Sequence, residues 1–207
     1  MSAWAALQHR TVGFDLDQTL VDTTAATRLA LHAIDPAIVD RVDLVRCQTS
    51  REGLMEELGR HLPAGDLPAA LRRYARTMAG EGLRRVTPLP GALDAVAAVH
   101  AAGGEVVVVT GRRTAAARTF LDTCGLAADA VHGGVSGLAK SPLLKWHGAG
   151  VYVGDHPLDM GAAVAADAVG IGVGTGGFSA AQLTQAGAAM VASTLAQLRD
   201  MPATTSR

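Results

Sequence analysis

The sequence predicts an α/β fold: a Rossmann-like core built on a parallel sheet, with a small helical domain inserted after the first strand. Short apolar runs recur along the chain and are continuous, which is typical of strands buried on both faces of a parallel sheet. Helical patterns alternate with these runs, as they do in sheets joined by right-handed crossovers. One long stretch, residues 22–86, breaks the alternation and contains no convincing strand.

The expected elements of the core follow one another in a regular order. The strands are expected at 11–15 (TVGFD), 105–111 (EVVVVTG), 150–155 (GVYVGD) and 168–174 (AVGIGVG). The core helices are expected near 91–102, 113–124, 157–166 and 179–187. Alternation of this kind places parallel strands side by side and leaves the helices on the faces of the sheet.

The stretch 22–86 has the pattern of helices alone. They are expected near 24–34, 36–46, 51–62 and 67–80, separated by DP, TS and PAGD. Pro36 and Pro68 suit the first turn of a helix, and Asp35 or Ser50 can cap a helix N-terminus. We therefore expect this stretch to form a small domain of its own.

The segment TPLPGA at 87–92 looks like the return to the α/β pattern. We expect residues 1–21 and 87–207 to form the core domain, and residues 22–86 to form the inserted helical domain. A chain of 207 residues, 49% of them hydrophobic, is long enough for a sizeable core and a small companion.

Composition narrows the classes of partner. Charged residues are 18% of the chain and the formal net charge is −1, which argues against nucleic acid, since phosphate backbones are held by clustered Lys and Arg. No apolar run approaches the ~20 residues that a bilayer requires, and MSAWAALQHR lacks the features of a signal peptide. Cys47 and Cys124 form no C-x-x-C pair and are expected as buried thiols. We expect a cytoplasmic monomer or homodimer that binds neither membrane nor nucleic acid.

Chemically useful residues stand where the expected core strands end. In open α/β sheets, ligands bind at the carboxyl ends of the strands. If the strands are parallel, these side chains converge on one edge of the sheet. The residues concerned are Asp15, Asp17, Thr110, Asp155 and, one helical turn further, Asp159.

Three or four carboxylates in one place raise each other's pKa, and a divalent cation relieves this crowding. Mg²⁺ prefers one or two carboxylates, several waters and a substrate phosphate. One carboxylate can attack phosphorus and form an aspartyl-phosphate. A second can donate a proton to the leaving oxygen and later take one from the attacking water. A hydroxyl, turn N–H groups and a lysine would complete a phosphoryl site.

These motifs, in this order, resemble those of the haloacid dehalogenase-like hydrolase superfamily. DLDQT at 15–19 looks like its D-x-D-x-T motif, and VVVVTG at 106–111 like its hydrophobic strand ending in Thr. Lys140 in GLAKSPLL looks like the lysine of the third motif, and VGDHPLD at 153–159 like the fourth, G-D-x-x-x-D. LPGA at 89–92 and the closing GIGVGTGG resemble the phosphoglycolate-phosphatase-like branch, in which a helical cap follows the first motif.

The resemblance implies a role for each matched residue. Residues 22–86 would be the cap. Asp15 would be the nucleophile and Asp17 the general acid/base. Thr110 would bind the phosphoryl oxygens, and Lys140 would steady the phosphate and the nucleophile.

The resemblance also implies a magnesium site. Asp155 would ligate Mg²⁺ together with Asp15 and the main-chain carbonyl of Asp17, and Asp159 would lie in or near the second coordination sphere. One departure concerns the third motif. Lys140 is not followed by the usual pair of prolines, so Lys145 is an alternative for its role.

Substrate contacts are expected from residues beside the motifs. Gly111 and Arg112 follow Thr110 directly, where a turn N–H and a guanidinium can approach the phosphate. Arg46 and Arg51 lie between two expected cap helices, and an arginine there would suit a phosphoester that also bears a carboxylate. Solvated surface positions are the alternative for both.

We therefore expect a Mg²⁺-dependent phosphatase that hydrolyses a small phosphorylated metabolite through an aspartyl-phosphate. A phosphomutase of the same superfamily remains open, because the same residues can return the phosphoryl group to a sugar. From other classes, a receiver-like phosphoacceptor also uses an aspartyl-phosphate, Mg²⁺, Thr and Lys, but normally carries the aspartate after a later strand. A non-catalytic binding protein is disfavoured by the intact set of catalytic residue types, although a fold never guarantees activity.

Overall fold

The computed structural model describes residues 11–198, so the expectations for residues 1–10 and 199–207 lie outside the described residues. The chain divides into two compact units. One is Asp22–Thr87, and the other is made of the residues that precede and follow it. Within the described range, no helix has the length and apolar character needed to cross a bilayer.

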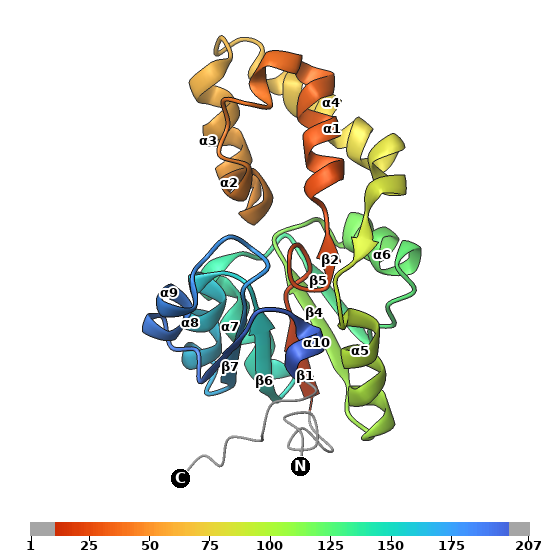
Figure 1. Ribbon diagram of the computed structural model, residues 1–207, viewed down its shortest axis with the longest axis vertical. Helices are drawn as coiled ribbons and strands as arrows, with labels where there is room; N and C mark the ends of the chain where they lie inside the picture. Colours follow the sequence, from red (N-terminus) through yellow and green to blue (C-terminus); the bar gives the residue numbers. More distant parts are fainter. Residues whose placement is uncertain (1–10, 199–207) are drawn as a thin grey trace. The chain divides into compact units, whose positions relative to one another are not determined.

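The discontinuous unit is an α/β core with a six-stranded sheet in the order β5-β4-β1-β6-β7-β8 (Figure 1). Every neighbouring pair in it is parallel. The strands are β1 Thr11–Phe14, β4 Val106–Thr110, β5 Ala130–Gly133, β6 Ala149–Gly154, β7 Val169–Val173 and β8 Met190–Ala192. The α/β fold with a parallel sheet is confirmed, and so are the four expected strands, to within a residue at each end.

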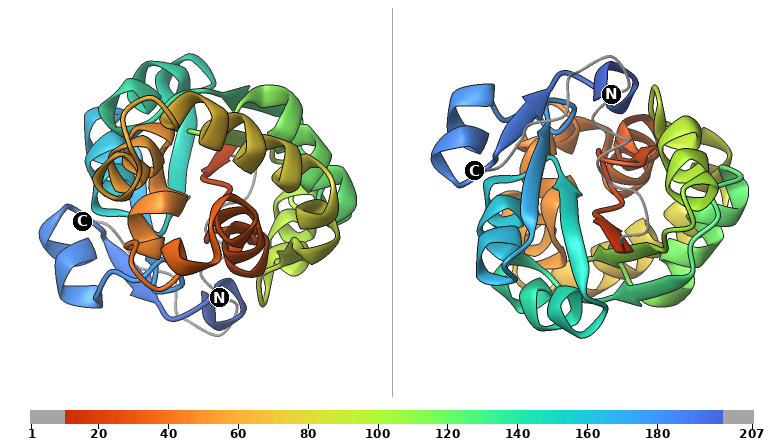
Figure 2. Two further views of the ribbon diagram at one scale, coloured as in Figure 1. Left: turned by 90° about the horizontal axis from the view of Figure 1, so that it is seen from above. Right: turned by 90° about the horizontal axis from the view of Figure 1, so that it is seen from below.

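Helices cover both faces of this sheet, α7, α8 and α9 on one face and α5 and α6 on the other (Figure 2). The helices are α5 Ala92–Ala101, α6 Thr114–Thr123, α7 Ser141–Trp146, α8 Pro157–Ala165, α9 Ala180–Gln185 and α10 Leu195–Leu198. All five side chains of β4 are buried, as a continuous apolar run predicts. Between the sheet and α7 and α8, a core cluster includes Val107, Leu144, Tyr152 and Ala163.

Two strands of the core were absent from the sequence expectation. They are β5 (AVHG) and β8 (MVA), the two edges of the sheet. Edge strands are short and partly solvated, so they lack the continuous apolar run that marks an inner strand. The helices α7 and α10, six and four residues long, were also absent from the helices expected from the sequence.

The unit Asp22–Thr87 is helical, as expected. Its elements are α1 Thr24–Ile34, η2 Pro36–Ile38, α2 Leu44–Thr49, α3 Arg51–His61, α4 Leu67–Ala79 and η3 Glu81–Arg85. The chain enters through β2 (Val21–Asp22) and leaves through β3 (Thr87–Pro88), which pair with each other. The expected helix 36–46 was wrong: a 3-10 turn occupies its start, and α2 begins only where the Asp43 side chain caps it, accepting from Arg46 N at 3.2 Å.

A close contact between the start of α5 and α10 depends on Gly91. This residue has φ +87°, and a Cβ there would lie 2.1 Å from Ala196 N. The backbone of Ala196 donates to Pro90 O at 3.1 Å, which holds the two segments together. Any side chain at position 91 would therefore have to separate them.

Replacing this glycine should destabilise the core. Gly91→Ala is expected to lower the free energy of unfolding by about 3 kcal/mol or more, because it adds a backbone clash to the cost of a positive φ. Gly125→Ala is the matched control: Gly125 has φ +67°, but a Cβ at this position would meet nothing within 4 Å. This control should lose only about 1 kcal/mol. Urea denaturation followed by circular dichroism measures both, and equal losses would show that the α5–α10 contact does not require glycine.

Candidate active site

The carboxyl ends of β1 and β6 meet at the point where the order of the strands reverses. After β1 the chain crosses to β4 on one side, whereas β6 lies on the other side of β1. Phe14 of β1 is paired with Val153 of β6, and the N–H of Asp15 donates to Val153 O at 2.9 Å. Ligands of open α/β sheets bind in the crevice at such a reversal. The strand order therefore brings Asp15 and Asp155 into this crevice.

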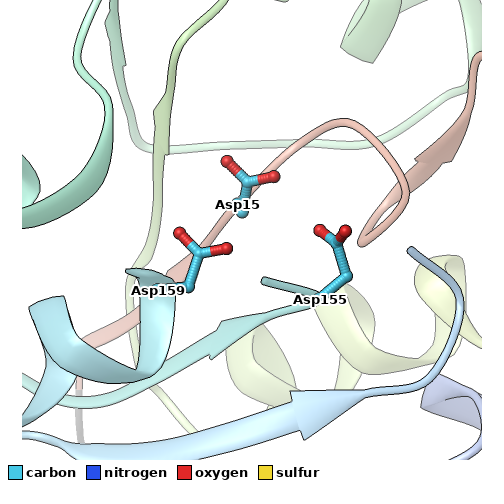
Figure 3. A group of neighbouring side chains, drawn as sticks. All are labelled: Asp15, Asp155 and Asp159. Atoms are coloured by element: carbon cyan, nitrogen blue, oxygen red, sulfur yellow. The ribbon is translucent and has the colours of Figure 1, made fainter. Parts of the chain in front are cut away.

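Three buried carboxylates gather there: Asp15 after β1, Asp155 after β6, and Asp159 in the first turn of α8 (Figure 3). Each offers one oxygen, and these three oxygens lie within 4.8 Å of one another. The exposed fraction is 8% for Asp15, 8% for Asp155 and 3% for Asp159. Oxygen donors at this spacing are able to hold a hard divalent cation.

Burial and mutual repulsion raise the pKa values of two of these carboxylates, Asp15 and Asp155. Burial, reinforced by the nearby Asp159, raises the pKa of Asp15 to about 7, even though Lys140 acts in the opposite direction. Burial and the charges of Asp15 and Asp159 raise the pKa of Asp155 well above its ordinary value. The Thr19 hydroxyl, which donates to Asp155 Oδ1 at 2.9 Å, offsets only part of this.

Lys140 supplies the positive charge inside the cluster. Its Nζ donates to Asp15 Oδ1 at 2.7 Å, to Asp159 Oδ1 at 2.6 Å and to the Tyr152 hydroxyl at 2.9 Å. Burial disfavours the ammonium, but Asp15 and Asp159 together raise the pKa of Lys140 well above its ordinary value. Lys140 is 4% exposed, whereas the alternative, Lys145, is exposed and pairs with Asp167 at 3.1 Å.

Asp17 belongs to an adjoining group of polar side chains. Arg112 binds its carboxylate through two hydrogen bonds, from Nε to Oδ2 at 3.0 Å and from Nη2 to Oδ1 at 2.6 Å. The N–H of Arg112 donates to Thr110 Oγ1 at 3.1 Å, and its guanidinium lies over the Phe120 ring, 4.4 Å from the centroid. This bidentate hydrogen bonding fixes the plane of the Asp17 carboxylate as well as its position.

The turn after Asp15 is braced against the loop that follows β7. Gln18 adopts φ +59°, and its carbonyl accepts a hydrogen bond from the Thr175 hydroxyl. A Cβ at the neighbouring Gly176 would lie 1.6 Å from Asp155 Oδ2. Only glycine therefore fits beside this carboxylate, which gives the GVGTGG segment a direct connection to the site that the sequence did not reveal.

The other expected substrate residues are placed as follows. Gly111 is half-buried directly after Thr110, at the end of β4. Arg51 is an exposed residue at the start of α3, and Arg46 forms ion pairs with Glu56 and Glu57 within the helical unit. Both arginines belong to the helical unit, whereas the carboxylate cluster belongs to the core unit.

Tyr152 is a further residue of this site that the sequence did not reveal. It lies in the middle of β6 with 0% exposure, among core side chains. The available signal was its hydroxyl, because a buried tyrosine in an apolar strand must find a hydrogen-bond partner.

The fold and the site together define a class of protein. The chain belongs to the haloacid dehalogenase-like hydrolase family, which matches residues 12–163. A phosphoglycolate phosphatase from Caulobacter vibrioides is 29% identical over 136 residues, covering 61% of this chain and 57% of that protein. The chain therefore matches little more than half the length of that relative.

Solved structures share the fold. A haloacid dehalogenase-like family hydrolase from Streptococcus pneumoniae has a TM-score of 0.77 at 16% identity and covers 92% of this chain and 96% of its own. A protein described as a predicted phosphoglycolate phosphatase from Haemophilus somnus has a TM-score of 0.77 at 20% identity, with coverage of 92% and 96%. At these identities the likeness concerns the fold, and it extends over the helical unit as well as the core.

The raised pKa of Asp15 predicts a pH dependence of stability in the absence of divalent cations. Because folding raises this pKa from 3.8 to about 7, the native state binds a proton that the unfolded chain releases, and stability falls as the pH rises between these values. Asp15→Asn removes this dependence. Above the folded-state pKa, the variant should be more stable than the wild type by up to about 4 kcal/mol, since each pKa unit corresponds to about 1.4 kcal/mol.

Urea denaturation in EDTA across this pH range measures the difference in free energy of unfolding between the variant and the wild type. The control is Asp40→Asn, because Asp40 is exposed. The gap between Asp15→Asn and the wild type should close toward acid pH. A gap that is constant with pH would mean that Asp15 does not titrate in this window.

Proposed function

We propose that this protein is a Mg²⁺-dependent phosphatase that hydrolyses a small phosphate ester through an aspartyl-phosphate on Asp15. The observation that carries the proposal is the buried group at the carboxyl edge of the sheet, in which Lys140 Nζ lies 2.7 Å from Asp15 and 2.6 Å from Asp159. Membership of the hydrolase family and the likeness to the Caulobacter vibrioides phosphatase support it.

The residues present fit a divalent cation. When ionised, the four aspartates of the two adjoining groups carry four negative charges, and Lys140 and Arg112 carry two positive ones. The net charge of these six groups is therefore −2, which one Mg²⁺, a cation that prefers oxygen ligands, would balance. Asp15, Asp155 and Asp159 would hold the ion, with the carbonyl of Asp17 as a further ligand. When bound, Mg²⁺ would neutralise charge on the phosphoryl oxygens.

Asp15 is the nucleophile in this proposal. A carboxylate oxygen of Asp15 attacks the phosphorus, the ester P–O bond breaks, and the phosphoryl group remains on Asp15. The Lys140 ammonium favours the ionised form of Asp15, because the two groups are hydrogen-bonded inside a buried site. The Thr110 hydroxyl and the turn N–H groups at Gly111 bind the phosphoryl oxygens.

Asp17 is the general acid and base. It donates a proton to the leaving oxygen in the first step and accepts one from the water that attacks the aspartyl-phosphate in the second. Arg112 orients this carboxylate through its two hydrogen bonds. Asp15 and Asp17 have separate surroundings, because one contacts a lysine among carboxylates and the other contacts an arginine.

The helical unit Asp22–Thr87 is the cap in this proposal. It excludes water from the first step and selects the phosphorylated metabolite. Arg51, exposed at the start of α3, is the cap residue proposed to contact an anionic group of the substrate.

Hydrolysis of p-nitrophenyl phosphate tests the proposed chemistry. Turnover should require Mg²⁺, stop in EDTA, and disappear in Asp15→Asn. Asp17→Asn should lose about 10²- to 10⁴-fold in kcat with its circular dichroism spectrum unchanged, as expected for loss of a general acid. Turnover that survives in Asp15→Asn would refute the nucleophile, and stable phosphorylation without turnover would indicate a receiver-like phosphoacceptor. A panel of phosphate esters, including phosphoglycolate and sugar phosphates, then identifies the substrate.

The two lysines of the sequence offer a matched pair of variants. Lys140→Met should reduce kcat by about 10³-fold, because a buried charge beside the nucleophile is lost. Lys145→Met should remain close to wild type, since Lys145 is exposed and pairs with an exposed Asp167. Steady-state kinetics at saturating Mg²⁺ measures both, and the opposite ranking would assign the third-motif role to Lys145.

A further inference from the structure

The ammonium of Lys140 has three N–H donors, and the structure provides three acceptors for it. Two are the carboxylates of Asp15 and Asp159, and the third is the neutral hydroxyl of Tyr152 at 2.9 Å. Three acceptors around one nitrogen determine both its position and its rotation. The carboxylates alone would leave one N–H without a partner in this buried group, which is costly.

The Tyr152 hydroxyl is itself held in the orientation that an acceptor requires. It lies 3.1 Å from the Val109 carbonyl and 3.3 Å from Asp159 Oδ1, and either of these oxygens can take its single proton. In both cases a lone pair of the hydroxyl faces Lys140. Its ring has 0% exposure, so Tyr152 does not meet a substrate that arrives from solvent.

The slot for the tyrosine ring is built into β1. Gly13 is paired with Tyr152 across the two central strands, and a Cβ at Gly13 would lie 2.8 Å from Tyr152 Cδ2 and 2.7 Å from Leu144 Cδ2. Because position 13 is a glycine, the ring can lie against β1 two residues before Asp15. The glycine of GFDLD thus makes room for the side chain that reaches the lysine.

We propose that Tyr152 is a positioning residue: its hydroxyl is the third acceptor of Lys140 and holds the ammonium between Asp15 and Asp159. For catalysis, the inference rests on the function proposed above. Without the hydroxyl, the ammonium is held by its two carboxylates only, and its position beside Asp15 is less closely fixed. The attack by Asp15 becomes slower, whereas substrate binding is unaffected because Tyr152 does not touch the substrate.

The first test does not require activity. With only two lysines in the sequence, ¹⁵N-labelled lysine gives two ammonium signals, and the exposed Lys145 is an internal control. In the wild type, the ammonium protons of Lys140 should exchange with water far more slowly than those of Lys145. Tyr152→Phe should speed the exchange at Lys140 by about tenfold or more, because one of its N–H groups loses its acceptor.

Tyr74→Phe is the matched control, since Tyr74 is the other tyrosine of the sequence and is also buried, with its hydroxyl 3.4 Å from Thr27 Oγ1 in the helical unit. In Tyr74→Phe, the ammonium protons of Lys140 should exchange with water at the wild-type rate. An unchanged Lys140 signal in Tyr152→Phe would overturn the proposal. Fast exchange at Lys140 in the wild type would also overturn it, whether or not the variant folds.

The second test is kinetic. Tyr152→Phe should lower kcat by about tenfold and leave KM within about twofold, while its thermal unfolding shows that the protein is folded. In a Lys140→Met background, the same substitution should have no further effect on the residual rate, because Tyr152 acts through Lys140. Full additivity of the two losses would overturn the proposal. A wild type inactive on every phosphate ester would refute the proposed function alone, and the lysine exchange would still decide the role of Tyr152.

Discussion

The contact between the Lys140 ammonium and two buried carboxylates is the interaction on which the site depends. Asp15, Asp155 and Asp159 repel one another in a region with little water, and the chain supplies one cation directly among them. That cation serves Asp15 and Asp159, whereas Asp155 is held by the Thr19 hydroxyl. The cluster therefore has one side compensated by the chain's own charge and another held by a neutral hydroxyl. This asymmetry gives the three carboxylates different surroundings although they share one crevice.

Glycines allow the charged groups to approach so closely. A Cβ at Gly154 would lie 2.5 Å from the Asp159 Cβ, and one at Gly176 would overlap the Asp155 carboxylate. A Cβ at Gly13 would likewise overlap the ring of Tyr152, which contacts Lys140. At all three glycines the backbone lies too close to a side chain of the site to leave room for a Cβ. The site is thus compact because these positions are glycines as well as because the aspartates lie close together.

The sequence predicted the inner sheet and the three carboxylates of the cluster, because each depends on a local pattern. Buried parallel strands are continuously apolar, and the aspartates stand at their carboxyl ends. The edge strands β5 and β8 and the break within the expected helix 36–46 left no such pattern: the edges are partly solvated, and the break depends on a cap by Asp43. Tyr152 and Gly176 were missed because their contacts join strands and loops distant in sequence, and the pairing of Arg112 with Asp17 spans 95 residues.

The position of β1 at the centre of the sheet has a consequence for the order of assembly. It is the first strand of the described chain, yet its neighbours β4 and β6 begin at Val106 and Ala149. During translation, the segment GFDLD has no partner strand until far more of the polypeptide has left the ribosome, and pairings so distant in sequence form slowly. The nascent chain therefore carries an apolar strand without its partner strands over this interval.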